Sequence, residues 1–190
     1  GDYDECVRLI EEGADVNQQS EYGHTALMFA SDKGHTCVVK LLLEKEPDIH
    51  VASKTHWMTG WTALHLSAFG GDVDTCSNGA LCGHTDICSM LIDKGAFVNQ
   101  LTDNEMTPLL LASYSGHRSN IKLLLDKGAN VNLTDHQKYT ALHYWSAHGD
   151  VESCLMLIDK GADVNKQAKN GKTALLLASE SGNKDVVQLL

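Results

Sequence analysis

Three cysteines and a histidine crowd into one short stretch of the chain, at Cys76, Cys82, His84 and Cys88. Thiolates and imidazoles are the usual ligands of zinc, so this stretch could hold a metal ion. Its spacing matches no common structural zinc site, in which cysteines are paired two residues apart. Cys88 also falls at a recurring helical position that we expect to be buried. We therefore favour small packed side chains here and predict no cofactor. A zinc-dependent module at the 71–88 insertion is the alternative.

The remaining chemistry-bearing residues form no recognisable catalytic set. The sequence contains no phosphate-binding loop, no Gly-x-Ser-x-Gly turn and no His-Glu-x-x-His pair. Several of the ten histidines recur at fixed positions, such as His65 and His143, which follow the same Thr-Ala-Leu start. A packing role explains this repetition, whereas a catalytic pair would not repeat. We predict that the chain is not an enzyme.

Two short motifs alternate along the chain and define its organisation. The first is a threonine followed by Ala-Leu or Pro-Leu, at Thr25, Thr62, Thr107, Thr140 and Thr173. The second reads Gly-Ala-x-Val-Asn and begins at Gly13, Gly95, Gly128 and Gly161, with a divergent copy at residues 46–50. From Thr107 to Thr140 and from Thr140 to Thr173 the period is 33 residues.

Each motif carries the end signals of a short helix. The threonines suit N-caps, and Pro108 stands at a first helical position, where a missing N–H costs nothing. Glycines such as Gly116 should end this first helix. A second apolar run, such as residues 121–125, should end at a Lys-Gly pair. Each unit is therefore two short helices and a turn, which can bury its apolar face only against its neighbours.

The period and the two motifs together resemble the ankyrin repeat over the whole chain. The resemblance implies an all-α solenoid of helix–turn–helix units with hairpin-like fingers, with about four full repeats plus partial terminal repeats. We divide the single array 1–190 into 1–22 (partial), 23–59, 60–104, 105–137, 138–170 and 171–190 (partial). The ragged ends indicate a segment of a longer protein, and a self-associating short array is the alternative.

Two repeats are longer than the period. Extra residues between positions 50 and 60 should lengthen a finger that carries Trp57 and Met58. Twelve further residues between positions 71 and 83 should bulge between the two helices of their repeat without breaking the stack. Both insertions are expected to lie in loops.

Single residues also break the pattern. Glu46-Pro47 replaces Gly-Ala, and the residue before a proline avoids helical geometry, so this helix end should differ from the others. Trp145 stands where the other repeats carry Ala or Ser. A tryptophan there must either push into a neighbouring helix or emerge beside Tyr144, and the sequence does not decide between the two.

The resemblance implies a function as well as a fold. In this family, partners usually lie on the finger tips and on the concave face of the first helices. The predicted partner-binding residues are Tyr22, His24, Trp57, Met58, Trp61, Phe69, Met106, Tyr114, Tyr139, Tyr144 and His148. Asn17, Asn99, Asn132 and Asn165 resemble substrates of asparaginyl hydroxylases, although hydrogen bonding of the turn is their more ordinary role.

Composition narrows the class of partner. The formal net charge of −10 argues against nucleic acid and against anionic membrane surfaces. The longest apolar runs are too short to cross a bilayer, so we predict no direct membrane insertion. Six cysteines in a chain that needs no disulfides indicate an intracellular location, in the cytoplasm with the nucleus as the alternative. The sequence thus predicts a non-catalytic scaffold that binds another protein, with a structural spacer in a larger protein as the alternative.

Overall fold

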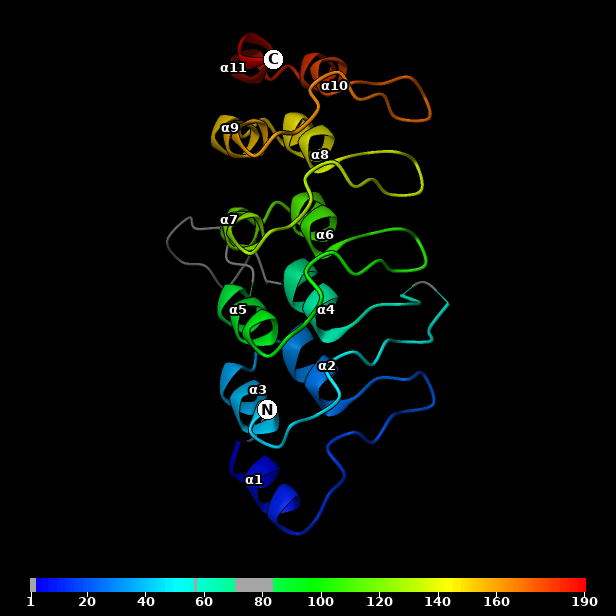
Figure 1. The fold of residues 1–190 in the computed structure, drawn as a ribbon, viewed down its shortest axis with the longest axis vertical. Helices are drawn as coiled ribbons and strands as arrows, with labels where there is room; N and C mark the ends of the chain where they lie inside the picture. Colours follow the sequence, from blue (N-terminus) through cyan, green and yellow to red (C-terminus); the bar gives the residue numbers. More distant parts are fainter. Residues whose placement is uncertain (1–2, 57, 71–83) are drawn as a thin grey trace.

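The computed structural model describes residues 3–56, 58–70 and 84–190, and in these ranges every regular element is a helix (Figure 1). The helices are α1 (Tyr3–Glu11), α2 (Ala26–Asp32), α3 (Thr36–Leu43), α4 (Ala63–Phe69), α5 (Thr85–Asp93), α6 (Pro108–Ser115), α7 (Arg118–Asp126), α8 (Ala141–His148), α9 (Val151–Asp159), α10 (Ala174–Glu180) and α11 (Lys184–Leu189).

These helices form two rows along an elongated stack, with the two chain termini toward opposite ends (Figure 1). The first helices of the repeats, α2, α4, α6, α8 and α10, make one row, and the second helices, α1, α3, α5, α7, α9 and α11, make the other. The loops that follow the second helices extend to one side as fingers, on the right of Figure 1. This arrangement confirms the predicted all-α solenoid.

Threonine side chains start the first helices, as the motif predicts. The Oγ1 atoms of Thr25, Thr107 and Thr173 each accept a hydrogen bond from the backbone N–H three residues further on. Each of these bonds satisfies one of the N–H groups that a helix start leaves without a partner. The recurring Thr-x-Leu motif is therefore a local signal for where each first helix begins.

Histidine extends this cap into a link between loops. The Nδ1 atom of His65 accepts a hydrogen bond from the backbone N–H of Thr62, and its Nε2 lies 3.0 Å from the carbonyl oxygen of Gln100. His143 Nδ1 likewise accepts from Thr140 N–H, but its Nε2 lies 3.2 Å from the carbonyl oxygen of Lys172, at the other end of the next finger loop. Each ring thus ties the start of a first helix to the finger loop that follows in the chain.

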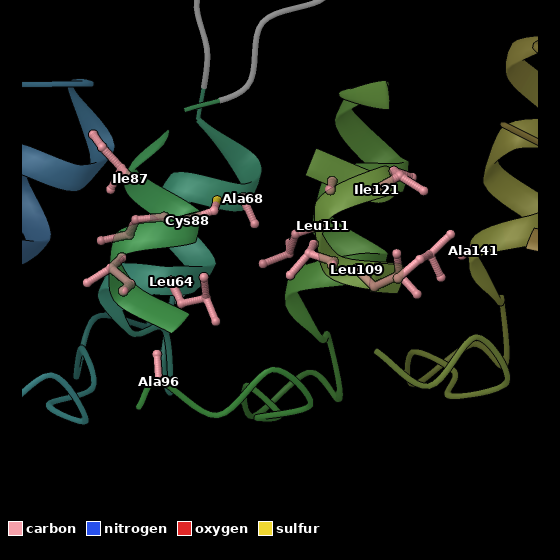
Figure 2. Packing of buried hydrophobic residues seen from close by; sticks show 14 of the residues in the cluster. Leu64, Ala68, Ile87, Cys88, Ala96, Leu109, Leu111, Ile121 and Ala141 are labelled. Atoms are coloured by element: carbon pink, nitrogen blue, oxygen red, sulfur yellow. The ribbon is translucent and has the colours of Figure 1, made fainter. Parts of the chain in front are cut away.

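Stacking buries a continuous apolar core between the two rows. In Figure 2, Leu64 and Ala68 of α4 lie close to Cys88 of α5, and all three side chains are almost completely buried. Leu109 of α6 and Ile121 of α7 repeat the arrangement one unit along. No single repeat encloses such a core, so the stability of each unit depends on its neighbours.

Trp145 points into this core. Its side chain is only 1% exposed, and its ring centroid lies 5.4 Å from that of His148. The indole Nε1 has no hydrogen-bond partner among the described residues. Of the two orientations that the sequence left open, the structure shows the inward one, while the neighbouring Tyr144 stays partly exposed.

The helix end at Glu46 differs from the others by less than predicted. Glu46 adopts φ 51°, in the left-handed region that Gly128 occupies with φ 87° in its own repeat. The turn is therefore kept, with glutamate where glycine would be unstrained. One hydrogen bond is lost. Ala129 N–H donates to the carbonyl of Leu124 in its repeat, but Pro47 at the same position has no N–H.

The long insertion changes the end of α4. Gly70 is the C-cap residue and has φ −71°, whereas α6 ends at the left-handed Gly116. The insertion itself, with Cys76 and Cys82, lies outside the described residues, as does Trp57.

Candidate protein-binding surface

The fingers form a hydrogen-bonded row. Within one finger, Asp135 N–H donates to the carbonyl of Tyr139, and Lys138 N–H donates back to the carbonyl of Asp135. Between fingers, His136 N–H donates to the carbonyl of Asn104 at 3.3 Å. Equivalent bonds between fingers run from Lys54 to Tyr22, from Asp103 to Thr59 and from Lys169 to Gln137. A surface built on these fingers is held in place before any partner arrives.

The base of a finger also contacts the first helix that follows it. The residue before the N-cap threonine meets a side chain on the exposed face of that helix in four repeats. The pairs are His24–Phe29 (ring centroids 5.2 Å apart), Trp61–Phe69 (5.3 Å), Tyr139–Tyr144 (5.8 Å) and the ion pair Lys172–Glu180 (2.6 Å). Fingers and first helices therefore form one continuous surface.

Five aromatic side chains join along this surface across three repeats. We call Trp61, Phe69, Tyr114, Tyr144 and Tyr139 the aromatic row. The rings of Phe69 and Tyr114 stack with centroids 6.4 Å apart, and Tyr114 meets Tyr144 edge-on at 5.6 Å. Because both contacts join different repeats, the row crosses the boundaries between units. Aromatic side chains of this kind bury a large area at a small entropy cost.

One end of the aromatic row is fixed by a buried carboxylate. The hydroxyl of Tyr144 donates to Oδ2 of Asp135 at 2.6 Å, and Asp135 is only 4% exposed. The other carboxylate oxygen accepts hydrogen bonds from the N–H groups of Gln137 and Tyr139. Burial, the hydrogen bond to Asp135 and the negative charge of that carboxylate together raise the pKa of Tyr144 well above its usual value. The tyrosine is therefore a neutral, oriented donor.

The predicted partner-binding residues differ in exposure. Tyr114 and Tyr22 are the most exposed, at 57% and 54%, and Phe69 and His148 are exposed too. The partly buried members are His24, Met58, Met106, Tyr139 and Tyr144. Trp61 is 8% exposed, so it supports Phe69 from beneath more than it faces solvent. Trp57 lies outside the described residues.

Phe29 belongs to this surface, although the sequence motifs did not single it out. Its ring is 53% exposed and packs against His24 at the base of the first finger. It occupies the helical position of Tyr144, four residues after the N-cap threonine. Comparing this position across repeats would not have found it, because Leu66 and Leu111 at the same position are buried.

The four asparagines named as hydroxylation candidates join consecutive turns. Asn132 accepts a hydrogen bond from Asp163 N–H at 2.9 Å and donates its side-chain amide to the carbonyl of Gly161 at 2.9 Å. Asn99 makes the same two contacts with the next turn, and Asn17 makes the first of them. The side-chain amide of Asn165 has no hydrogen-bond partner among the described residues. Hydrogen bonding of the turn is thus one role of these side chains.

Of the four residues suggested as metal ligands, Cys88 and His84 lie in the described residues, and both contact the repeat stack. Cys88 Sγ lies 3.1 Å from Ser67 Oγ, and burial raises the pKa of this thiol to about 12. His84 Nε2 lies 3.1 Å from the carbonyl oxygen of Asp32 in the preceding repeat. In the described residues no group of three or more His, Cys, Asp and Glu side chains could hold a metal ion. A zinc site that used Cys88 would have to draw this side chain out of its packing.

Comparison with known proteins agrees with this architecture. A family model described as ankyrin repeats (3 copies) matches residues 1–78, 75–135 and 130–190. Similar proteins include the probable E3 ubiquitin-protein ligase XBOS33 of Oryza sativa subsp. japonica, 39% identical over 71 residues, 37% of this chain and 13% of that protein. The ankyrin repeat-containing protein ITN1 of Arabidopsis thaliana is 35% identical over 85 residues, 45% of this chain and 12% of that protein. Inversin of Danio rerio is 33% identical over 86 residues, 45% of this chain and 7% of that protein.

These similarities cover only a small part of each relative. At most 13% of the length of the three proteins is matched, so the similarity concerns repeat units and not whole proteins. No helix in the described part of the chain is long and apolar enough to cross a membrane.

Proposed function

The chain belongs to the ankyrin-repeat family, and from this we propose that it is a non-catalytic scaffold that binds a partner protein on its finger tips and first-helix face. Ankyrin repeats are in general protein–protein interaction modules. The observation that carries the finer proposal is the aromatic row, which crosses three repeats and ends in a tyrosine oriented by a buried carboxylate. Binding there needs no chemistry, only shape and side-chain contact.

The preorganisation of this surface supports the proposal. Hydrogen bonds join neighbouring fingers, and Tyr144 is held by Asp135, so little conformational freedom remains to be lost on binding. Tyr114 and Phe69 then offer exposed aromatic surface on a rigid support. Exposed aromatic residues on rigid elements are the commonest centres of binding energy in protein interfaces. A spacer with no partner here would leave this arrangement without a use.

Charge and cysteine contacts narrow the kind of partner and the compartment. With a net charge of −10, the chain suits a protein partner and not nucleic acid. The buried thiols of Cys88 and Cys154 each contact a serine hydroxyl, and the cysteines within the described residues are free thiols, which supports a reducing, intracellular compartment. Three of the relatives are named as E3 ubiquitin-protein ligases or probable ones, but their matched segments give no support for ligase activity in this chain.

The test replaces exposed members of the aromatic row without touching the core. The double variant Phe69→Ser/Tyr114→Ser should lose the partner captured by the unaltered chain from a cell lysate, with at least about ten-fold weaker binding to the purified partner. Trp61 is avoided because it is buried, and its loss would confuse binding with folding.

The matched control is Leu155→Ser. Leu155 is 41% exposed on α9, in the row of second helices, so its replacement removes a similar exposed apolar side chain away from the aromatic row. The control should retain the partner, and thermal unfolding should show that both variants are folded. If Phe69→Ser/Tyr114→Ser keeps the same partners as the control, the aromatic row is not the binding surface.

A further inference from the structure

One junction between repeats lacks the polar contact that joins the others. Elsewhere the asparagine at the end of the Val-Asn turn accepts a hydrogen bond from the following repeat, as Asn132 does from Asp163 N–H. At the junction of the second and third units, His50 replaces this asparagine, and Phe97 replaces the residue that would donate to it. The two rings stack instead, with centroids 4.4 Å apart and planes 26° apart. Both replacements occur together, so an aromatic contact has taken the place of a hydrogen bond.

The same junction also lacks an ion pair. Lys127 Nζ lies 2.7 Å from Asp93, and Lys160 Nζ lies 3.4 Å from Asp126, so the ends of neighbouring second helices are joined in the later repeats. The corresponding residues at this junction are Lys94 and Glu44. Within the described residues they form no ion pair. The ends of α3 and α5 are thus not joined by this ion pair.

Three adjoining hollows follow this junction. A hollow of about 300 Å³ lies between the ends of α3 and α5, over Leu43 and Met90. It shares Leu43 and Lys94 with a second hollow of about 360 Å³ beneath the Glu46-Pro47 turn. That hollow shares Ile49 and His50 with a third, of about 80 Å³, beside Phe97. We call the three together the rear groove, because it follows the second helices and their turns and not the aromatic row.

The groove combines an apolar floor, an aromatic wall and an acidic rim. Phe97 is 60% exposed, so one face of the stacked pair is available to a ligand. The two larger hollows are lined by more carboxylates than ammonium groups, so their rim is net negative. The carboxylates belong to Glu44, Glu46, Asp48 and Asp93, and the ammonium groups belong to Lys40 and Lys94. Asp93 is paired with Lys127, whereas Glu44 and Glu46 form no ion pair in the described part of the chain.

We propose that the rear groove is a second binding site, for a peptide segment of a partner protein in which an apolar side chain lies between arginines. The apolar side chain would cover Leu43 and Met90 on the floor. One guanidinium would pair with the free carboxylates, and the other would lie on the exposed face of Phe97. The negative charges of the same rim would repel an acidic peptide.

The sequence itself supplies a variant that removes the aromatic wall of this site while favouring the fold. The triple replacement Glu46→Gly, His50→Asn and Phe97→Asp installs the residues found at Gly161, Asn165 and Asp163 in a regular repeat. It should restore the asparagine contact and relieve the left-handed glutamate, so thermal stability should be equal or higher. A loss of binding in this variant therefore cannot be attributed to unfolding.

The experiment titrates the ¹⁵N-labelled chain with the synthetic peptide Gly-Arg-Leu-Arg-Gly and follows the backbone amide signals. The expected shifts lie at Leu43, Lys94 and Phe97, and the triple variant should bind at least about ten-fold more weakly. Gly-Arg-Ser-Arg-Gly tests the apolar floor and Gly-Glu-Leu-Glu-Gly tests the charge, and both should bind more weakly than the first peptide. The front variant Phe69→Ser/Tyr114→Ser should bind it unchanged, which separates this site from the aromatic row.

Three results would overturn the proposal. Gly-Arg-Leu-Arg-Gly could cause no shifts at millimolar concentration, or shifts spread evenly over the acidic surface. The triple variant could also bind the peptide as tightly as the unaltered chain does. In any of these cases the rear groove is not a peptide site. The proposal about the aromatic row is independent of this result and is decided by its own test.

Discussion

The side-chain amide of Asn120 donates to the main-chain carbonyl of Ala68 at 3.2 Å, across the boundary between two repeats. The same amide lies 3.3 Å from the carbonyl of Ser67, and its oxygen accepts from the Thr85 hydroxyl. The carbonyls belong to the end of α4, where the long insertion replaces the usual left-handed glycine turn. A completely buried asparagine of the next repeat thus supplies the donor that these carbonyl groups have among the described residues.

Asn120→Val should destabilise the chain, although valine stands at this position in two other repeats, as Val38 and Val186. The substitution leaves buried carbonyl oxygens without a donor, which costs about 1–3 kcal/mol in free energy of unfolding. Urea unfolding followed by circular dichroism measures the change, with the exposed Ser119→Ala as the control. A variant as stable as the unaltered chain would mean that the α4 carbonyls do not need Asn120.

Tyr144→Phe should lower the free energy of unfolding by about 1–2 kcal/mol, because it leaves one oxygen of the buried Asp135 carboxylate without its donor. Tyr114→Phe is the matched control, since the Tyr114 hydroxyl makes no hydrogen bond within the described residues and the ring is exposed. Chemical denaturation of the two variants gives the comparison. Equal losses would show that the Tyr144–Asp135 bond contributes nothing to stability.

The fold could be predicted from the sequence because its signals are local and recur. Threonine caps, the Lys-Gly helix ends and the asparagine turns each depend on residues within a few positions, and the 33-residue phase fixes their order. The candidate surface was harder to predict. Whether Trp61 or Trp145 faces solvent depends on the side chains of neighbouring repeats, and both prove to be buried.

The compensating residues could not be predicted for the same reason. Asn120 interacts with carbonyls more than fifty positions earlier, at the end of α4, which does not close on a left-handed glycine as α6 does. The stack of His50 on Phe97 likewise depends on two replacements 47 positions apart. A motif that averages over repeats hides such pairs, because each one differs from the pattern at the place where it acts.

Glu46→Gly should stabilise the chain by about 1 kcal/mol, because a side chain in the left-handed region carries a steric cost that glycine does not. Its neighbour Glu44 has right-handed φ −69°, so Glu44→Gly should instead destabilise by about 1 kcal/mol. Thermal unfolding of the two variants should therefore move in opposite directions. If both are destabilised, residue 46 is not held in the left-handed conformation.

Acid should weaken the fold through its buried histidines. Burial lowers the pKa of His65 to about 4 from its ordinary value of about 6.5. Between these two pH values the unfolded chain binds a proton that the folded chain does not, so the free energy of unfolding falls as the pH decreases. The loss from His65 reaches about 3 kcal/mol at pH 4, and His117 and His143, whose pKa values burial also lowers, add to it.

The pH effect is tested by urea unfolding at pH 7.5, 6.0 and 5.0 in the unaltered chain and in His65→Gln. The variant should be less stable at pH 7.5, because it loses the bonds to Thr62 and Gln100, but should lose less stability on acidification. Parallel pH profiles would show that the proton uptake on unfolding comes from other groups.

Asparaginyl hydroxylation, if an asparaginyl hydroxylase accepts this chain, should occur first at Asn165. Its side-chain amide makes no hydrogen bond within the described residues, whereas Asn132 is bonded to both Asp163 and Gly161 and must be freed before an enzyme can reach it. Intact-mass and peptide spectra after enzyme treatment would locate each added oxygen, with Asn165→Ala as the control that removes the first site. Modification of Asn132 ahead of Asn165 would contradict this order, because the bonded side chain would then be the more accessible one. An unchanged mass would remove all four asparagines from consideration as substrates of that enzyme.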